Sequence, residues 1–328
     1  MGCCQSNQGR QNSKSLGSVL LPHRVGPHNV NPDIQYWDPE TQSLVKEEIY
    51  GEKWLRFSYD HFLGQVGLWA LVKRAWFSRW YGSRMDHKNS REKIAPFIRK
   101  YNLKVDEFLE DPESFQSFNE FFYRKLRPSA RPIQPLTNRV VFPADGRHLL
   151  IPDLSLTQTI YAKGQSFDLV RLLGDTILAS YYERGSMLIS RLCPVDYHRF
   201  HFPCSGRIGE TRLINGSLFS VNPIALRKKL SIFWENKRYC SVIENSKGEK
   251  IVQLLIGATC VGKVHITSKP NTLVNKGDEY GYFAFGGSCV ITIFPPSLIK
   301  FNQDLVEQSN KGVEYYAQVG QCLGTFDE

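Results

Sequence analysis

A Gly-Gly-Ser sequence at residues 286–288 could carry out chemistry on the chain itself. Glycine lacks the Cβ atom that would crowd the preceding carbonyl. The peptide at Gly287 can therefore adopt the strained turn that brings the Ser288 hydroxyl onto it. Glycine and serine also dominate ordinary turns, so the tripeptide alone predicts only a turn. Its meaning depends on the other reactive side chains of the chain.

Two further segments supply the side chains that a reactive serine needs. Asp145 stands beside a glycine in a Pro-Ala-Asp-Gly sequence, and His198 and His201 follow in a His-x-x-His sequence. Activating a serine takes a base for its proton and a carboxylate that orients the base, in any chain order. Asp145, His201 and Ser288 fit those roles. Each segment also has an ordinary interpretation, as a good turn and as two structural histidines.

Ten short motifs follow one another along the chain. They are FNEFFYRKL at 118–126, RPI at 131–133, PADG at 143–146, KGQSF at 163–167, LLG at 172–174, DYHRFH at 196–201, SVNP at 220–223, NKR at 236–238, GATCVG at 257–262 and KGDEYG at 276–281. With this order and spacing, the chain resembles the pyruvoyl-dependent phosphatidylserine decarboxylases over roughly residues 56 to 328. Any one motif would be weak, whereas the ordered set is specific.

This resemblance implies that the chain cuts itself, using the Asp-His-Ser set named above. His201 takes the proton of the Ser288 hydroxyl. Ser288 then attacks the Gly287 carbonyl and converts the peptide bond into an ester. Elimination from the ester releases residues 1–287 and leaves a dehydroalanine, which takes up water and loses ammonia to become a pyruvoyl group. The expected products are a large chain, 1–287, and a small chain, 288–328.

The resemblance also implies a covalent pyruvoyl cofactor derived from Ser288, with no pyridoxal phosphate and no metal. The ketone forms a Schiff base with the amine of phosphatidylserine and accepts the electrons left when CO2 departs, which yields phosphatidylethanolamine. His198 matches the family histidine of decarboxylation. Returning a proton to the carbanion is a general-acid task that suits imidazole.

Cys289 departs from the family, which generally carries Thr or Ser at this position. A neighbouring hydroxyl would help to hold a developing oxyanion, and a thiol donates a poorer hydrogen bond. Slower cleavage than in relatives is one expectation, and a competing nucleophile is another. Because Cys289 lacks two glycines immediately before it, Ser288 remains the favoured attacker.

Composition fits a globular protein that meets an anionic surface. The 328 residues are 41% hydrophobic, which is enough for a large core, and the formal net charge is +9. The eight cysteines form no C-x-x-C pair, so neither a zinc ribbon nor a redox dithiol is expected. No nucleic-acid-binding motif occurs, so nucleic acid is not an expected partner.

The first residues, Met-Gly-Cys-Cys-Gln-Ser, fit the pattern for N-myristoylation at Gly2, and Cys3 and Cys4 add palmitoylation sites. Two acyl chains would make a stable anchor where one gives only marginal binding. Residues 1–50 otherwise have the composition of a disordered tail, with or without lipid. Neither a signal peptide nor a transmembrane helix is expected, so the predicted location is peripheral, on the cytosolic side of an unidentified membrane.

Aromatic and basic residues recur at helical spacing over residues 61–81. They predict an amphipathic helix that either lies in the headgroup region of an anionic membrane containing phosphatidylserine or packs against a protein core. Residues 51–135 are therefore predicted to form a helical, membrane-associating region. Within it, residues 90–127 read as helical segments that close before Pro128.

The rest of the chain, residues 136–328, changes to strand patterns. Apolar runs at 140–142, 187–189, 251–256 and 290–294 are separated by Gly, Pro and Asn. The predicted fold class is α+β, with an amphipathic helical region before a β-rich, barrel-sandwich-like catalytic core. The resemblance implies that the small chain stays bound to the large chain after cleavage and that homodimers are common.

Two other functions remain open at this point. One is a pyruvoyl-dependent decarboxylase of a soluble, for example aromatic, amino acid, which the same chemistry would serve. The other is an uncleaved, membrane-anchored scaffold without activity, for which Cys289 is the only indication.

Overall fold

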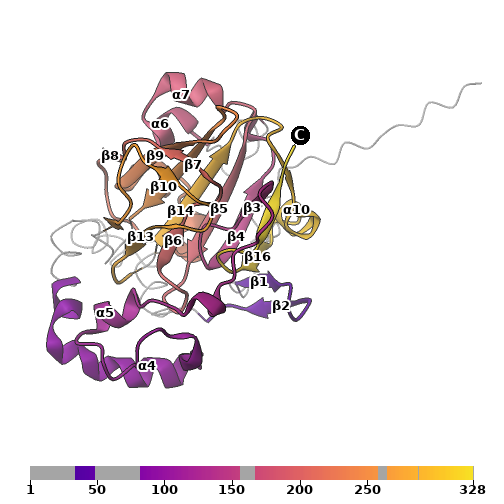
Figure 1. The fold of residues 1–328 in the computed structure, drawn as a ribbon. Coiled ribbons are helices and arrows are strands. Elements are labelled where there is room, and N and C mark those ends of the chain that lie inside the picture. Colours follow the sequence, from indigo (N-terminus) through magenta and orange to yellow (C-terminus); the bar gives the residue numbers. More distant parts are fainter. Residues whose placement is uncertain (1–33, 49–81, 156–166, 258–263, 287, 328) are drawn as a thin grey trace, which may run out of the picture.

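The computed structural model describes residues 34–48, 82–155, 167–257, 264–286 and 288–327 (Figure 1). Its centre is the strand β14 (Ser288–Phe294), all of whose residues are buried. It pairs antiparallel with β10 (Lys250–Ile256) on one side and β5 (Ser186–Leu192) on the other. Each of these strands has seven residues and is mostly apolar, as expected for strands buried on both faces.

The described strands form three sheets. The large sheet has eleven strands, in the order β12 (Leu273–Val274), β7 (Gly206–Ile208), β9 (Arg238–Glu244), β10, β14, β5, β4 (Gly146–Ile151), β16 (Glu314–Ala317), β1 (Gln35–Asp38) and β2 (Ser43–Lys46), with β8 (Arg212–Ile214) paired to β9. The smaller sheets are β11 (Val264–Ile266), β13 (Glu279–Phe283) and β6 (Arg199–His201), and β15 (Ile299–Phe301), β17 (Cys322–Phe326) and β3 (Arg139–Val141).

Alternate residues of the central strand face two different cores, as the period of two of a strand requires. Cys289, Ile291 and Ile293 lie in the first core, which the short helices complete. Val290 and Phe294 lie in the second core, which the two small sheets complete. The large sheet is thus the middle layer of three.

The helices are short and lie outside the large sheet (Figure 1). Those of the first core are α6 (Leu169–Leu173), α7 (Thr176–Tyr181), α8 (Pro223–Lys228) and α9 (Ile232–Glu235). The others are η2 (Lys88–Lys93), α4 (Ile94–Tyr101), η3 (Val105–Glu107), α5 (Phe118–Phe122), η4 (Pro128–Ala130) and α10 (Gln303–Asn310).

The helices α4 and α5 pack around phenylalanines. Phe97 of α4 and Phe118 and Phe122 of α5 belong to a third core, which also takes in Phe285 from the chain just before β14. The Ser117 hydroxyl caps α5 by accepting a backbone N–H from its first turn. This third core therefore ties the helical region to the Gly-Gly-Ser segment.

The helices predicted within residues 90–127 are confirmed at α4 and α5, but the chain between them holds only the 3-10 turn η3 in this described range. Pro112 disfavours helix at Asp111, whose carboxylate instead accepts a backbone N–H two residues later, at 2.8 Å. Leu126 forms an isolated β-bridge with Phe108, so the chain after α5 is extended and not helical as predicted.

The predicted α+β class and all four predicted strand runs are confirmed. The strand order of the large sheet has two ends, so among the described strands it is open and not closed into a barrel. The lipidation residues Gly2, Cys3 and Cys4 and the amphipathic segment 61–81 lie outside the described residues, as does Gly287.

Candidate active site

Ser288 is the first residue of β14 and has no exposed surface. Its backbone lies opposite Leu192 of β5, and its buried Oγ atom has no hydrogen-bond partner among the described residues. Gly286, two residues earlier, has a φ of 136°, which side-chain-bearing residues rarely adopt. A buried hydroxyl without a partner does not stabilise the fold, and the hydroxyl of Thr292, on the same face of β14, shares this property in the described chain.

Both histidines of the His-x-x-His sequence leave one nitrogen free. His198 Nδ1 lies 3.0 Å from the carbonyl oxygen of Asp196, and His201 Nδ1 lies 2.8 Å from that of Gly277. A carbonyl only accepts, so Nδ1 carries the proton in each ring. Each Nε2 atom is buried and has no partner within the described ranges, which leaves a lone pair available to take a proton.

Burial keeps both imidazoles neutral. It lowers the pKa of His198 to about 3 and lowers the pKa of His201 below its ordinary value. His198 lies beside the chain that leads to the serine, because its backbone carbonyl accepts the N–H of Phe283 at 2.9 Å. Its ring also packs on Phe122, with 3.8 Å between ring centroids. The two histidines are therefore in the form that a general base requires.

The carboxylate of Asp145 is paired with Arg131 and not with a histidine. Arg131 donates from Nε and Nη2 at 2.7 to 3.0 Å, and the N–H of Val319 donates at 2.9 Å. The predicted partner, His201, touches this loop through its backbone N–H, which donates to Pro143 at 2.7 Å. The charges of Glu279 and, after it, Asp145 raise the pKa of His201 through space, against the larger effect of burial. Asp145 thus acts on His201 electrostatically in this arrangement.

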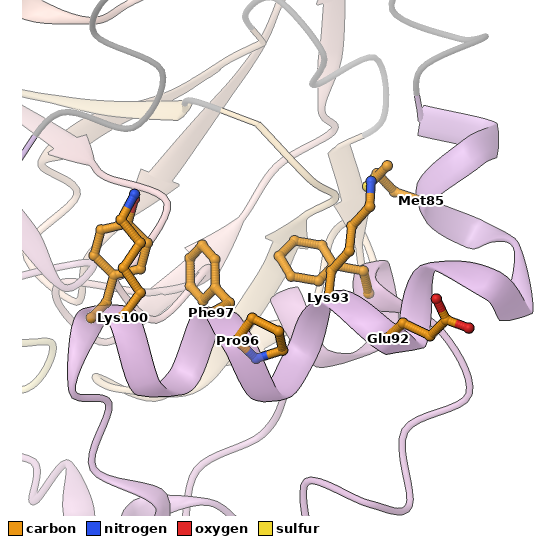
Figure 2. A pocket seen from close by; sticks show the side chains of 8 residues that line it. Met85, Glu92, Lys93, Pro96, Phe97 and Lys100 are labelled. Atoms are coloured by element: carbon orange, nitrogen blue, oxygen red, sulfur yellow. The ribbon is translucent and has the colours of Figure 1, made fainter.

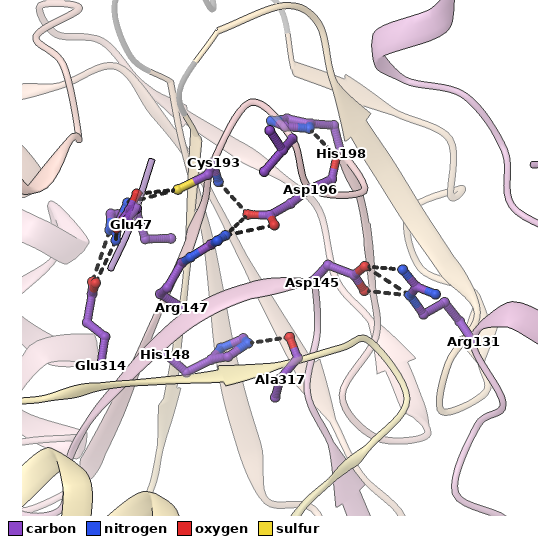
Figure 3. Close-up of polar contacts among 12 residues, drawn as sticks. Glu47, Arg131, Asp145, Arg147, His148, Cys193, Asp196, His198, Glu314 and Ala317 are labelled. Atoms are coloured by element: carbon purple, nitrogen blue, oxygen red, sulfur yellow. Dashed lines mark hydrogen bonds and ion pairs between the residues drawn. The ribbon is translucent and has the colours of Figure 1, made fainter. Parts of the chain in front are cut away.

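A buried ion pair that the sequence analysis missed holds the turn before β6 (Figure 3). Arg147 donates to both carboxylate oxygens of Asp196, at 2.7 and 2.5 Å. The same carboxylate accepts the backbone N–H of Cys193 at 2.6 Å, and the Asp196 carbonyl orients the ring of His198. Arg147 therefore supports the ring of His198 indirectly, through Asp196.

Other charged and polar side chains extend this cluster. Arg191 bridges Glu47 and Glu314 at 2.6 and 2.5 Å, and the pair with Glu47 holds the pKa of that carboxyl at about 2 against burial. His148 shares a hydrogen bond of 2.9 Å with Ser190, and burial lowers its pKa to about 3. In the sequence, these pairs are indicated only by Arg147 and Arg191, which lie in mostly apolar strand segments. Buried charges are almost always paired, so each arginine implies a carboxylate partner.

Removing Arg147 is expected to cost about 3–5 kcal/mol of unfolding free energy, because the Asp196 carboxylate is left buried and unpaired. Urea unfolding of Arg147→Ala in an uncut Ser288→Ala chain measures this. Arg147→Met combined with Asp196→Asn should recover most of the loss, because no uncompensated charge remains. A loss below about 1 kcal/mol in Arg147→Ala would place the pair among weak surface ion pairs.

Comparison with known proteins gives the family. Residues 118–325 match the family model described as phosphatidylserine decarboxylase. This span is more than half of the chain. The chain belongs to the phosphatidylserine decarboxylase family.

Relatives with the name phosphatidylserine decarboxylase proenzyme match most of the chain. The protein of Chlamydia muridarum is 44% identical over 292 residues, which are 89% of this chain and 97% of the relative. That of Desulfitobacterium hafniense is 41% identical over 291 residues, 89% of this chain and 98% of the relative. That of Clostridium kluyveri is 38% identical over 291 residues, with the same two coverages.

The match to the phosphatidylserine decarboxylase family includes all four predicted side chains of the site, which are Asp145, His198, His201 and Ser288. The match begins at Phe118, the first residue of α5. The helix that contacts Phe285 and His198 therefore lies within the family match.

Cys289 lies in the first core with no exposed surface. It points to the opposite face of β14 from Ser288, because neighbouring strand residues alternate. Burial raises the pKa of its thiol, which stays protonated. This orientation supports neither of the two effects on processing expected from the sequence.

A hollow of about 450 Å³ lies on the helical region (Figure 2). Its lining residues are Met85, Glu92, Lys93, Pro96, Phe97, Lys100, Tyr101 and Phe118. None of them is a predicted site residue. Phe118 also packs edge-on against Phe285, at 5.3 Å between centroids, so aromatic side chains lie between this hollow and the segment before Ser288.

The described residues lack two kinds of feature. In that part of the chain, no group of three or more His, Cys, Asp or Glu side chains is arranged to hold a metal ion. None of the helices in the same ranges combines the length and apolar character needed to cross a membrane.

Proposed function

We propose that this chain is a proenzyme that cuts itself between Gly287 and Ser288 and then decarboxylates phosphatidylserine to phosphatidylethanolamine. Family membership and the names of the relatives support this function. The observation that carries the cleavage is the buried, unpartnered hydroxyl of Ser288, which directly follows two glycines.

In the proposed cleavage, His201 is the base. Its Nδ1–H bond to Gly277 leaves the Nε2 lone pair free to take the Ser288 hydroxyl proton. The Ser288 Oγ atom then bonds to the Gly287 carbonyl carbon, the C–N bond breaks, and the freed amine takes the proton, which gives an ester. Loss of the α-proton of residue 288 and breakage of its Cβ–Oγ bond then release residues 1–287 as a carboxylate and leave a dehydroalanine. The dehydroalanine takes up water and loses ammonia to give the pyruvoyl group. The buried charge of Asp145 stabilises the transient imidazolium through space.

Position 288 fits a pyruvoyl group. Its hydroxyl is orphaned, and a ketone end group carries neither a charge nor a donor that would need a partner there. When formed, the group supplies an electron sink for decarboxylation. His198 is the residue proposed to hold a proton and return it to the substrate carbon, and a bound anionic substrate would raise the pKa of its ring toward neutrality.

The membrane assignment is also proposed. Gly2, Cys3 and Cys4 are the proposed sites of lipid attachment, in the tail predicted over residues 1–50. That prediction is wrong for residues 35–46, which form β1 and β2 of the large sheet. Residues 51–135 are the proposed membrane-associating region and 136–328 the core, on the cytosolic face of a membrane. The net charge of +9 supports an anionic surface rich in phosphatidylserine. A homodimer is proposed from the family resemblance alone.

The mass of the small fragment and the choice of substrate test this function. Residues 288–328 should be lighter by one ammonia than a fragment with an N-terminal serine. Purified protein should release CO2 from phosphatidylserine vesicles but not from free serine or aromatic amino acids. An uncut active chain, or a fragment with an intact N-terminal serine, would contradict the proposal; activity on free amino acids alone would favour the soluble alternative.

A further inference from the structure

Asn119 links α5 to the chain just before the proposed cleavage site. Its side chain is 4% exposed. Its Oδ1 atom accepts the backbone N–H of Phe285 at 2.8 Å, and its Nδ2 atom donates to the Asp86 carboxylate at 2.5 Å. A carboxylate only accepts and a backbone N–H only donates, so these two partners fix which way the amide faces.

The segment before Ser288 is thereby held at both ends. Asn119 holds the backbone of Phe285, and the antiparallel ladder with β5 holds Ser288. Only two glycines separate these anchors along the chain, and the first, Gly286, has a φ of 136°. Two glycines between free ends would sample many conformations, whereas anchoring restricts them.

The same helix contacts the histidine beside this segment. Phe122 of α5 lies 3.8 Å from the ring of His198 and 4.9 Å from that of Phe285, measured between centroids. The bond from Asn119 therefore sets the Phe285 backbone relative to a helix that also packs on the site.

We propose that Asn119 is a positioning residue for self-cleavage, because its amide orients the Phe285 peptide so that the Gly287 carbonyl meets the Ser288 hydroxyl. This inference rests on the proposed cleavage between residues 287 and 288. Attack requires the reacting atoms at about 3–3.5 Å, and a displacement of about 1 Å can cost about 100-fold in rate. The hydrogen bond to Phe285 lies two residues before the attacked carbonyl, so its loss would allow displacements of this size.

Timed synthesis of the full chain in a cell-free system, with the uncut fraction measured on a denaturing gel, tests the inference. Asn119→Ala should slow cleavage by about 10- to 100-fold. Asn119→Asp keeps the acceptor for Phe285 but places a carboxylate against Asp86, so it should also be slow. Asn119→Asp with Asp86→Asn restores both bonds with the donor and acceptor of the pair exchanged. This double variant should cleave within about threefold of the wild type.

Ser117→Ala is the matched control, because it removes the cap of α5 without touching Phe285. Thermal unfolding of each variant in a Ser288→Ala background measures the structural effect separately. Ser117→Ala should lower the midpoint and cleave at the wild-type rate. If it slows cleavage as much as Asn119→Ala does, the role of Asn119 is only structural and the inference is overturned.

Two other results would also overturn the inference. One is cleavage of Asn119→Ala within twofold of the wild type, and the other is a folded double variant that fails to cleave. If Asn119→Ala does not fold, the double variant decides. A wild-type chain that never cuts would refute the proposed function itself, which is a distinct outcome.

Discussion

Replacing Ser288 with alanine is expected to yield an uncut chain of 328 residues without decarboxylase activity. Alanine removes the hydroxyl that attacks and the atom from which the reactive ketone would form, so both reactions are lost together. Because the Ser288 hydroxyl has no hydrogen-bond partner in the described chain, its removal leaves no group unsatisfied and should not weaken folding. A denaturing gel, a phosphatidylserine assay and thermal unfolding measure the three consequences.

The neighbouring cysteine is the control for this experiment. Cys289→Ala changes a buried side chain on the opposite face of the strand, so it should lower stability slightly and leave cleavage intact. The interpretation of Ser288 would be wrong if Ser288→Ala were cut at the same bond, or if Cys289→Ala abolished cutting as completely as Ser288→Ala.

Replacing His198 with alanine is expected to leave cleavage largely intact and to reduce turnover by about 10²–10⁴-fold, the usual contribution of a general acid. The expected split follows from the proposed division of roles, in which His201 serves the first reaction and His198 the second. Quantifying the cut fraction and the rate of CO2 release on the same preparation tests it. His201→Ala should show the reverse, an uncut chain.

The low pKa of His198 also predicts how stability depends on pH. In the unfolded chain its ring takes a proton below about pH 6.5. In the folded chain it does so only near a pKa of about 3. The unfolded state therefore binds more protons between these values, and stability falls as the pH falls through them. In a Ser288→Ala background, His198→Ala should make this fall shallower; an unchanged slope would mean that the ring is not buried and neutral.

The sequence predicts the central strands well and the helical region poorly. Residues 251–256 and 290–294 are mostly apolar runs, interrupted only by Gln253 and Thr292, that suit a strand buried on both faces. Between α4 and α5, the phenylalanines are spaced like a helix, but they reach a common core through turns. Tertiary packing, which local spacing does not encode, decides that region.

The reactive residue types can be read from the sequence, but their pairings cannot. Asp145 meets Arg131 from fourteen residues away, and Asn119 meets Phe285 across 166 residues. Neither contact follows a helix or strand repeat, so no spacing rule gives it. The pairing of Arg147 is hidden for a related reason: its partner, Asp196, lies 49 residues away and meets it only when the chain folds.

The position of Ser288 bears on how its strand could begin a new chain. A cut by water would leave a protonated α-amino group on a residue with no exposed surface, and burying such an ion costs several kcal/mol. An uncharged terminus carries no such penalty. The dry interior around the first residue of β14 would thus disfavour a hydrolytic nick and tolerate a chain end that has lost its nitrogen.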